Sequence, residues 1–532
     1  MTIQTRMLRG TALATTSLAT IGLAATLTAG TAMAQSATVV LPAGEIGATS
    51  YDPIRASKLN TANALIYDRL VEQDADQSYH PHLATSWEEA PDGMAWTFTL
   101  KEGVTFHDGT AFDAQTVADW IPDFAGTENA FLAEAIESVE VVDPLTVKFV
   151  MNRPEPNLLY NLASTFMGVP SQTAYDEAGD DYGVSVAVGT GPFKLESFAI
   201  GLETVLTRND DYAWASPLSE NQGAAHLESV TFREIADQST AFLELKTGGV
   251  DVLLGVPTDF LEILGAEGNV NILNIPGTGI AYMPINVTAA PFDDIQVRQA
   301  TVLAVNQQAI VDSVYNGVGA PAHNFLISSL PESEVSPELD IAFDLERANA
   351  ILDEAGWAMG SDGVREKDGE RLAVDLFTQN DTEFKRLSQV VQAQLKDVGM
   401  EAEITVFDAS TIRDEYKRNT HQLAVRSYDW NNSDILDWFF SGERLGYPNV
   451  SMWNDPESER LNKVAMTESK TSDERIANFR AYHEYILGQA LFVPIYEPTT
   501  NIAYNTDTIQ LPETIRGPRF RSQSVVDMKP AE

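Results

Sequence analysis

The chain has 532 residues, of which 77 are acidic and 34 basic, 44% are hydrophobic and none is cysteine. This length suits two to four lobes, each with a sizeable hydrophobic core. A formal net charge of −43 disfavours nucleic acid and anionic membranes as partners, because both are recognised through basic surfaces. Without cysteine the chain has no disulfide, thiolate metal site, cysteine nucleophile or thiol-linked lipid anchor.

The first 34 residues have the three parts of a secretory signal peptide. Arg6 and Arg9 precede an alanine- and leucine-rich stretch at 11–27, and Ala32-Met33-Ala34 provides a small-residue cleavage site. A membrane anchor is the alternative, but Thr, Ser and Gly interrupt the apolar stretch, which is also short for a span. The pattern predicts cleavage after Ala34 and, without a lipid attachment site, a mature protein in the periplasm.

Strands and helices are expected in mixed order along the rest of the chain. Alternating apolar and polar residues predict strands at 95–100 and 104–106, and Asp113 is placed to cap the helix that follows. A strand–turn–strand pattern occupies 138–150. Later periodicities predict helices at 296–315, 388–398 and 479–491, and strands at 403–406 and 492–496. This mixture, without a regular βαβ repeat, predicts an α/β protein of more than one lobe.

No arrangement of residues in the sequence indicates catalysis. The nucleophile-elbow, zincin, phosphate-loop and EF-hand patterns are missing, and the Gly-Thr-Gly sequences at 189–191 and 277–279 are interpreted as turns. A metal site built from His80, His82 and His107 is conceivable, but exposed loop histidines are the favoured interpretation. We therefore expect no enzyme activity, no cofactor and no metal.

The segment at 81–110, PHLATSWEEAPDGMAWTFTLKEGVTFHDGT, strongly resembles the signature of the extracellular solute-binding proteins called family 5. These proteins are the peptide- and nickel-type binding components of ABC importers. Other motifs of the family occur in the right order: Tyr51-Asp52-Pro53, GTGPF at 189–193, TGGVD at 247–251, VRQA at 297–300, the helix at 348–357 and Pro494-Ile495-Tyr496. Because these motifs span nearly all of residues 40–500, the chain is identified as a member of the family.

The resemblance implies an α/β fold of the two-lobed periplasmic-binding-protein type (class II, cluster C). Lobe I would comprise residues 35–284 and 496–532, and lobe II residues 285–495. The chain would then cross between the lobes twice, near Met283–Asn286 and near Val493–Tyr496, and these crossings would form the hinge. The function implied is that of a monomer that closes on one solute and delivers it to an ABC permease in the inner membrane.

The resemblance also implies a ligand site in the aromatic and acidic segment at 426–440. In peptide-binding members an aspartate of this segment pairs with the α-ammonium group of the ligand, and Asp429 is the residue that matches. A desolvated carboxylate needs such a cation. Further candidate pocket residues are Tyr428, Trp430, Trp453, Tyr51 of the opening motif and Asn286 at the crossing. Core packing is the alternative for the tryptophans, and the favoured interpretation for Trp438.

Departures from the family pattern leave the ligand open. Dipeptide binders carry an arginine for the ligand carboxylate ahead of the helix at 388–398, but the loop at 378–382 has none. Nickel-type members carry arginines around what are here 129–131 and 166–168, and their absence disfavours a nickel chelate or haem. A short peptide or peptide-like amine is the favoured ligand. The alternatives are another ligand, such as an oligosaccharide, opine or metal chelate, and a secreted enzyme or adhesin.

Overall fold

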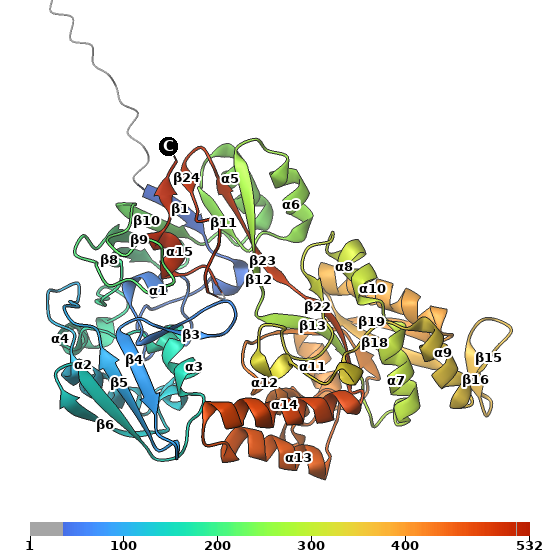
Figure 1. Cartoon of the computed structure of the whole chain (residues 1–532). Helices are drawn as coiled ribbons and strands as arrows, with labels where there is room; N and C mark the ends of the chain where they lie inside the picture. The colour runs from blue at the N-terminus through green and yellow to red at the C-terminus, as the bar shows by residue number, and fades with distance from the viewer. Residues whose placement is uncertain (1–35, 518, 532) are drawn as a thin grey trace, which may run out of the picture.

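The computed structural model describes residues 36–517 and 519–531, so the predicted signal peptide at 1–34 lies outside the described residues. Figure 1 shows two lobes of mixed strands and helices, joined by strands that run from one to the other. This architecture confirms the predicted α/β fold class. Among the described residues, no helix has the length and apolar character needed to cross a membrane.

The first lobe is built around a seven-stranded mixed sheet. In sheet order the strands are β12 (Val270–Pro276), β23 (Thr499–Asn505), β11 (Val252–Leu254), β1 (Ser36–Val40), β10 (Ser229–Arg233), β9 (Glu203–Arg208) and β8 (Phe193–Ala199). Strand β1 is parallel to β10 and β11, and the other pairs are antiparallel. The helices of this part are α1 (Asn63–Ile66), α5 (Gln238–Thr247), α6 (Thr258–Gly265) and α15 (Ser522–Val526). The late elements β23 and α15 therefore lie in the same lobe as β1, the first strand of the described chain.

A second sheet of the first lobe contains the family-like segment. Its order is β4 (Ala84–Glu89), β5 (Ala95–Leu100), β7 (Thr146–Met151) and β6 (Ile136–Asp143), with every pair antiparallel. In β5 the alternate residues Trp96, Phe98 and Leu100 are buried, as the period of two requires. The Asp113 side chain caps α2 (Ala114–Trp120), as predicted. The predicted strand at 104–106 is reduced to one bridge between Thr105 and Ala111.

Smaller elements complete the first lobe and one wall of the interlobe space. They are the hairpin β2 (Val71–Gln73) and β3 (Tyr79–Pro81), the helices α3 (Leu158–Ala163) and α4 (Gln172–Ala178), and a final two-stranded pair, β24 (Ile509–Gln510) and β25 (Lys529–Pro530). Helix α3 packs against β2. Gln73, Gln77 and Asn157 of this region contact Asn431 and Asn432 of the second lobe.

The second lobe contains two larger sheets and a small one. The first has the order β14 (Ala320–Pro321), β22 (Phe492–Glu497), β13 (Gly279–Pro284) and β21 (Arg426–Asp429), all antiparallel. The second is parallel, with β18 (Ala373–Gln379) between β19 (Glu401–Phe407) and β20 (Leu423–Ala424). The third comprises β15 (Ala358–Met359), β16 (Arg365–Lys367) and β17 (Glu370–Arg371).

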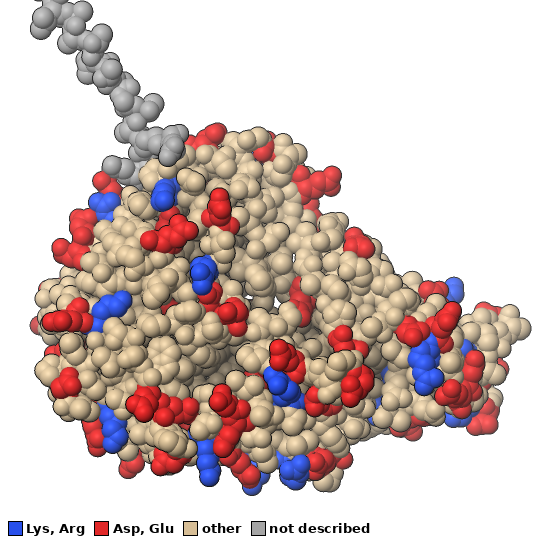
Figure 2. Space-filling view, in the orientation of Figure 1, with Lys and Arg blue, Asp and Glu red and all other residues tan. Residues whose placement is uncertain are grey.

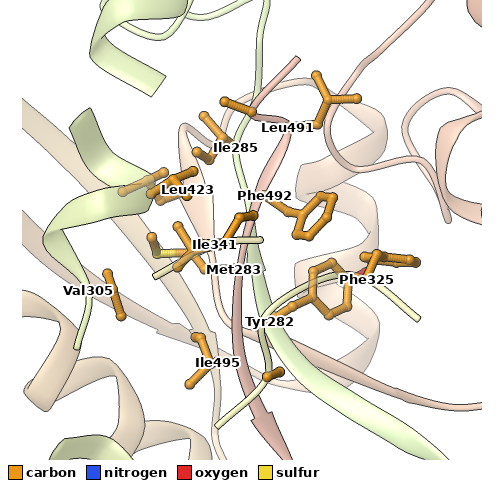
Figure 3. Packing of buried hydrophobic residues seen from close by; sticks show 14 of the residues in the cluster. Tyr282, Met283, Ile285, Val305, Phe325, Ile341, Leu423, Leu491, Phe492 and Ile495 are labelled. Atoms are coloured by element: carbon orange, nitrogen blue, oxygen red, sulfur yellow. The ribbon is translucent and has the colours of Figure 1, made fainter. Parts of the chain in front are cut away.

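Aromatic and aliphatic side chains from β13, β22 and the intervening loops form the core of the second lobe. Figure 3 shows Tyr282, Phe325 and Phe492 converging there, and Tyr282 meets Phe325 edge-on at a centroid distance of 5.0 Å. Met283 and Ile285 are fully buried in the same cluster. This packing fixes β13 in the second lobe.

Helices surround the sheets of the second lobe. They are α7 (Ile295–Ala304), α8 (Gln307–Val314), α9 (Leu345–Glu354), α10 (Thr382–Asp397), α11 (Ala409–Lys417), α12 (Ile435–Phe440), α13 (Pro456–Lys463) and α14 (Ser472–Gly488). The single helix predicted at 296–315 is two helices, because Asn306 leaves the helical conformation and its side chain caps α8. The other predicted helices and strands of this lobe are confirmed, although α10 and α14 begin earlier, at Thr382 and Ser472, than the predicted 388 and 479.

The chain crosses between the lobes at positions that differ from the sequence-based expectation. Strand β12 ends in the first lobe at Pro276 and β13 begins in the second at Gly279; the return crossing lies at Pro498, between β22 and β23. The Gly277 N–H donates to the Pro498 carbonyl at 2.8 Å, so the two crossings lie side by side. The expected hinge segments near Met283–Asn286 and Val493–Tyr496 instead lie within the second lobe, because β13 and β22 pair with each other there.

Candidate functional site: the interlobe cavity

A cavity of about 540 Å³ lies between the lobes. One wall comes from residues 131–166 of the first lobe, around α3, and the other from residues 430–479 of the second, around α12 and α14. Figure 2 shows the surface hollowed between the two lobes. Side chains that line the cavity include Phe131, Arg153, Glu155, Tyr160, Phe166, Trp430, Asp434 and Arg475. The size suits a small solute, because ligand pockets are commonly 300–1,000 Å³.

Asp434 is the carboxylate of the second lobe that lines this cavity. It occupies the N-cap position of α12, but its side chain accepts no hydrogen bond from the backbone of that helix. The Trp430 Nε1–H donates to Asp434 Oδ1 at 2.7 Å. Burial raises the pKa of Asp434 above its ordinary value, although the nearby Arg475 guanidinium acts in the opposite direction. A cationic ligand group placed beside Asp434 would stabilise its charged form.

Arg475 of α14 is held in place at the boundary between the lobes. Its Nη1 pairs with Glu332 Oε1 at 3.2 Å, and its Nη2 donates to Asn432 Oδ1 at 2.5 Å. The guanidinium also lies over the Phe479 ring, 4.4 Å from its centroid. Because these contacts satisfy Arg475 from inside the second lobe, it contributes a fixed positive charge to the cavity wall.

Amide side chains link the lobes beside the cavity. Asn431 Nδ2 donates to Gln73 Oε1 at 3.1 Å and to Gln77 Oε1 at 2.9 Å. The Tyr160 hydroxyl donates to Asn431 Oδ1 at 3.3 Å, and Asn432 Nδ2 donates to Asn157 Oδ1 at 2.8 Å. The structure therefore brings the lobes into direct polar contact at the segment that follows Trp430.

Asp429, the expected anchor, lies on β21 with its side chain 67% exposed. It accepts a hydrogen bond from Thr278 Oγ1 and faces Arg519 Nη2 at 3.4 Å. The aromatic neighbours do not enclose it, and it does not line the cavity. Trp430 does line the cavity and is 38% exposed. Trp438 was expected in the core but is 44% exposed, where Arg444 lies over its ring.

The other four candidates lie away from the cavity. The Tyr428 hydroxyl donates to the Phe325 carbonyl, and Trp453 packs against the core of the second lobe. Tyr51 is fully buried, with its hydroxyl 2.6 Å from Thr204 Oγ1. Asn286 is also fully buried and donates to the His421 carbonyl at 2.7 Å. These contacts give each residue a structural role in its own lobe.

The histidines considered for a metal site do not form one. His82 is buried, with Nδ1 3.0 Å from Glu72 Oε1 and Nε2 3.2 Å from Asp68 Oδ1. The His107 Nε2–H donates to the Gly191 carbonyl at 2.9 Å, and burial lowers the pKa of His107 to about 4. The expectation of exposed loop histidines is wrong for His82. Within the described residues, no group of three or more His, Asp or Glu side chains is arranged to hold a metal ion.

Sequence reasoning missed several residues that line the cavity. Tyr160, Glu155 and Arg475 belong to segments that no motif marked. Asn431 and Asp434 were visible in the aromatic and acidic segment, but the sequence offered no means of ranking them above Asp429. The first-lobe partners of Asn431, Tyr160 and Gln73, are more than two hundred residues away from it in the sequence.

Two lobes with a double crossing and a solute-sized cavity between them define a two-lobed binding protein. Residues 78–445 match the family described as bacterial extracellular solute-binding proteins, family 5 Middle. The chain belongs to this family.

Named relatives and solved structures agree with this assignment. The chain is 30% identical over 404 residues to the glutathione-binding protein GsiB of Salmonella paratyphi A, covering 74% of this chain and 75% of that protein. It is 27% identical over 406 residues to the dipeptide-binding protein of Escherichia coli K12, covering 70% and 72%. An ABC transporter substrate-binding protein from Sinorhizobium meliloti has the same fold, with a TM-score of 0.78, 22% identity and coverage of 93% and 100%.

Proposed function

We propose that this protein is the periplasmic substrate-binding component of an ABC importer, and that it captures a short peptide or peptide-like amine for delivery to the membrane permease. Family membership supports the transport role, and relatives named for a dipeptide and for glutathione support the ligand class. The observation that carries the proposal is Asp434, a half-buried carboxylate that lines the cavity between the lobes and accepts a hydrogen bond from the Trp430 indole.

Asp434 is better suited than Asp429 to hold an ammonium group. A charge-assisted hydrogen bond is stronger where less water is present, and Asp434 is half-buried in the cavity wall whereas the Asp429 side chain is 67% exposed. Asp429 also already faces the Arg519 guanidinium. The Trp430 indole fixes one oxygen of Asp434 and leaves the carboxylate oriented at the cavity. The ligand amine would therefore bind Asp434, with Trp430 as an adjacent aromatic wall.

Titration calorimetry with short peptides tests this assignment. Asp434→Asn keeps the shape of the side chain and its bond to Trp430 but removes the charge. We expect it to weaken peptide binding by about 30-fold or more, the effect of losing a buried charge-assisted contact of about 2–5 kcal/mol. Asp429→Asn is the matched control and should change affinity by less than about threefold. A larger loss in the control than in Asp434→Asn would make Asp429 the anchor.

Native mass spectrometry of protein purified from its own host would identify the ligand. A copurified peptide or amine supports the proposal, and an uncharged ligand contradicts it. The same spectrum reports the oligomeric state, for which we expect a monomer, and the mass of the mature chain. A mature chain that begins at Gln35 supports export and cleavage after Ala34, whereas retention of residues 1–34 contradicts them.

A sugar or chelate ligand is the second candidate function. It is favoured by the aromatic side chains Phe131, Phe166 and Trp430 on the cavity wall, because aromatic faces can stack on planar or ring-shaped ligands. The same transport role would apply. Binding of an oligosaccharide, an opine or a nickel chelate with no measurable affinity for peptides would select this candidate.

A further inference from the structure

A second cavity, of about 190 Å³, opens on the first lobe beside the interlobe cavity. Its wall combines residues 57–61, near the start of the chain, with Arg519 and Arg521, near its end. Phe166 lines both cavities, so they are adjacent. The C-terminal segment therefore brings two arginines to the edge of the solute-sized space.

The Arg521 side chain has no hydrogen bond or ion pair to any described residue, and its Nη1 is buried. Arg69 and Glu72, whose charges both act on Arg521, pair with each other, yet Arg69 Nη1 and Glu72 Oε2 are also buried without a hydrogen-bonding partner. Burial, together with the Arg69 charge, lowers the pKa of Arg521 to about 10, so the guanidinium is still charged at neutral pH. Buried donors of this kind are normally satisfied, and a missing partner of opposite charge would satisfy this one.

The balance of charge around the second cavity is opposite to that of the chain. Lys58, Arg519 and Arg521 are the basic residues of its wall, against the single acid Glu45, in a chain with 77 acidic and 34 basic residues. Glu45 Oε2 is occupied, because it accepts from Thr61 N at 2.6 Å and from Thr61 Oγ1 at 2.7 Å. An anion entering this cavity therefore meets a net positive site.

Tyr160 connects this basic site with the acidic site of the interlobe cavity. Burial raises the pKa of Tyr160; the Asp434 charge acts in the same direction, and Arg519 and Arg521 act against it. The Tyr160 phenol thus interacts electrostatically with a carboxylate of the second lobe and with two guanidinium groups of the first.

We propose that Arg521 binds the carboxylate of a ligand whose ammonium group is held by Asp434. The ligand is then a small zwitterion that spans the lobes, such as a short peptide with a free C-terminus. This inference rests on the proposed function and specifies its substrate class. It also explains how the chain can bind a carboxylate although the loop at 378–382 has no arginine.

The test compares each of several alanine-rich di- to pentapeptides with the same peptide carrying a C-terminal amide. Removing the carboxylate charge should weaken binding by about tenfold or more, the usual effect of losing a hydrogen bond to a charged group. Arg521→Gln should bind acid and amide with similar affinity, and Arg521→Lys should restore part of the preference. Arg208→Gln is the matched control, because Arg208 lies on β9 of the first lobe and lines neither cavity.

The outcomes separate this inference from the proposed function. If peptides bind the unmodified protein but the acid and amide forms bind equally, the carboxylate site is overturned while the proposed function stands. The same holds if Arg521→Gln keeps the full preference for the acid. If no peptide binds in either form, the proposed function is overturned and the inference with it. The comparison on the unmodified protein needs no substitution, so a folding defect in Arg521→Gln does not affect it.

Discussion

At the scale of single residues, the enclosure of a carboxylate decides its chemistry. Asp429 and Asp434 lie five residues apart in one acidic and aromatic segment. Asp429 meets solvent and Arg519, whereas Asp434 is half-buried, bonds the Trp430 indole and lines the cavity opposite residues 131–166. Of the two carboxylates, Asp434 has lost more water and is therefore the one that gains more from a cationic partner.

The raised pKa of Asp434 makes ligand binding dependent on pH. Burial disfavours the charged carboxylate in the unliganded protein; Asp437 and Glu332 add to this effect, and Arg475 and the Trp430 indole oppose it. Since an ammonium ligand needs the ionised form, affinity should be full above the raised pKa and fall as the pH drops through it. Calorimetry at several values between about pH 7 and pH 4 should show this decline.

The same titration with Asp434→Asn separates this effect from other ionisations. The variant should bind weakly at every pH, with a much flatter profile, because its amide does not titrate. A decline of equal size in the variant would show that another group controls the pH dependence.

At the scale of secondary structure, aspartate side chains begin many of the helices. Seven helices of the described chain have an aspartate N-cap that accepts from backbone N–H groups: Asp113, Asp237, Asp294, Asp344, Asp381, Asp408 and Asp455. A carboxylate there satisfies free donors and interacts favourably with the helix dipole. Part of the strong acidity of the chain therefore has a local structural role.

Helix α10 allows this contribution to be measured at both of its ends. Asp381 caps it through the N–H groups of Glu383 and Phe384, at 2.8 and 3.1 Å, whereas Asp397 is its last residue and exposed. We expect Asp381→Ala to lower the free energy of unfolding by about 1 kcal/mol. Asp397→Ala, the control with the same change of charge, should be neutral or slightly stabilising. Urea unfolding followed by circular dichroism measures both; equal losses would contradict a capping role.

Gly279 is required where the chain enters the second lobe. A Cβ atom at this position would lie 1.7 Å from the Tyr428 carbonyl oxygen, because β13 pairs closely with β21. We expect Gly279→Ala to destabilise the protein by about 1–3 kcal/mol, the usual effect of overpacking, and thermal unfolding should show a lower midpoint. Gly265→Ala is the control, because a Cβ there would meet only Ile272, at 3.7 Å. Equal midpoints for the two variants would contradict the requirement.

At the scale of the whole molecule, two crossings and a set of polar contacts hold the lobes together. Besides the amides at Asn431 and Asn432, Arg386 of α10 contacts both Asp259 oxygens, at 3.1 and 3.2 Å. These pairs are partly or fully solvent-accessible, so each contributes little to stability. Within residues 36–517 and 519–531 the chain crosses between the lobes at two places, from β12 to β13 and from β22 to β23, and Figure 1 shows both.

Ligand binding should therefore make the protein more compact in solution. A ligand held by both lobes binds the closed form better and shifts the population towards it. We expect small-angle scattering to give a smaller radius of gyration at saturating ligand, with an unchanged molecular mass of one chain. Asp434→Asn, at the same ligand concentration, should remain close to the unliganded value. An unchanged radius in the unmodified protein would contradict closure.

The sequence by itself determined the family, the mixed α/β architecture and most of the local elements. It also predicts the export signal, which lies outside the described residues. The strand at 95–100 and the cap at Asp113 were predictable because period-two alternation and capping depend on neighbouring residues alone. The positions of the lobe crossings and the enclosure of Asp434 and Arg521 were decided only by the tertiary structure. Burial of a charge depends on which distant segments cover it: residues 131–166 form the opposite wall from Asp434, and residues 57–61 form the wall beside Arg521.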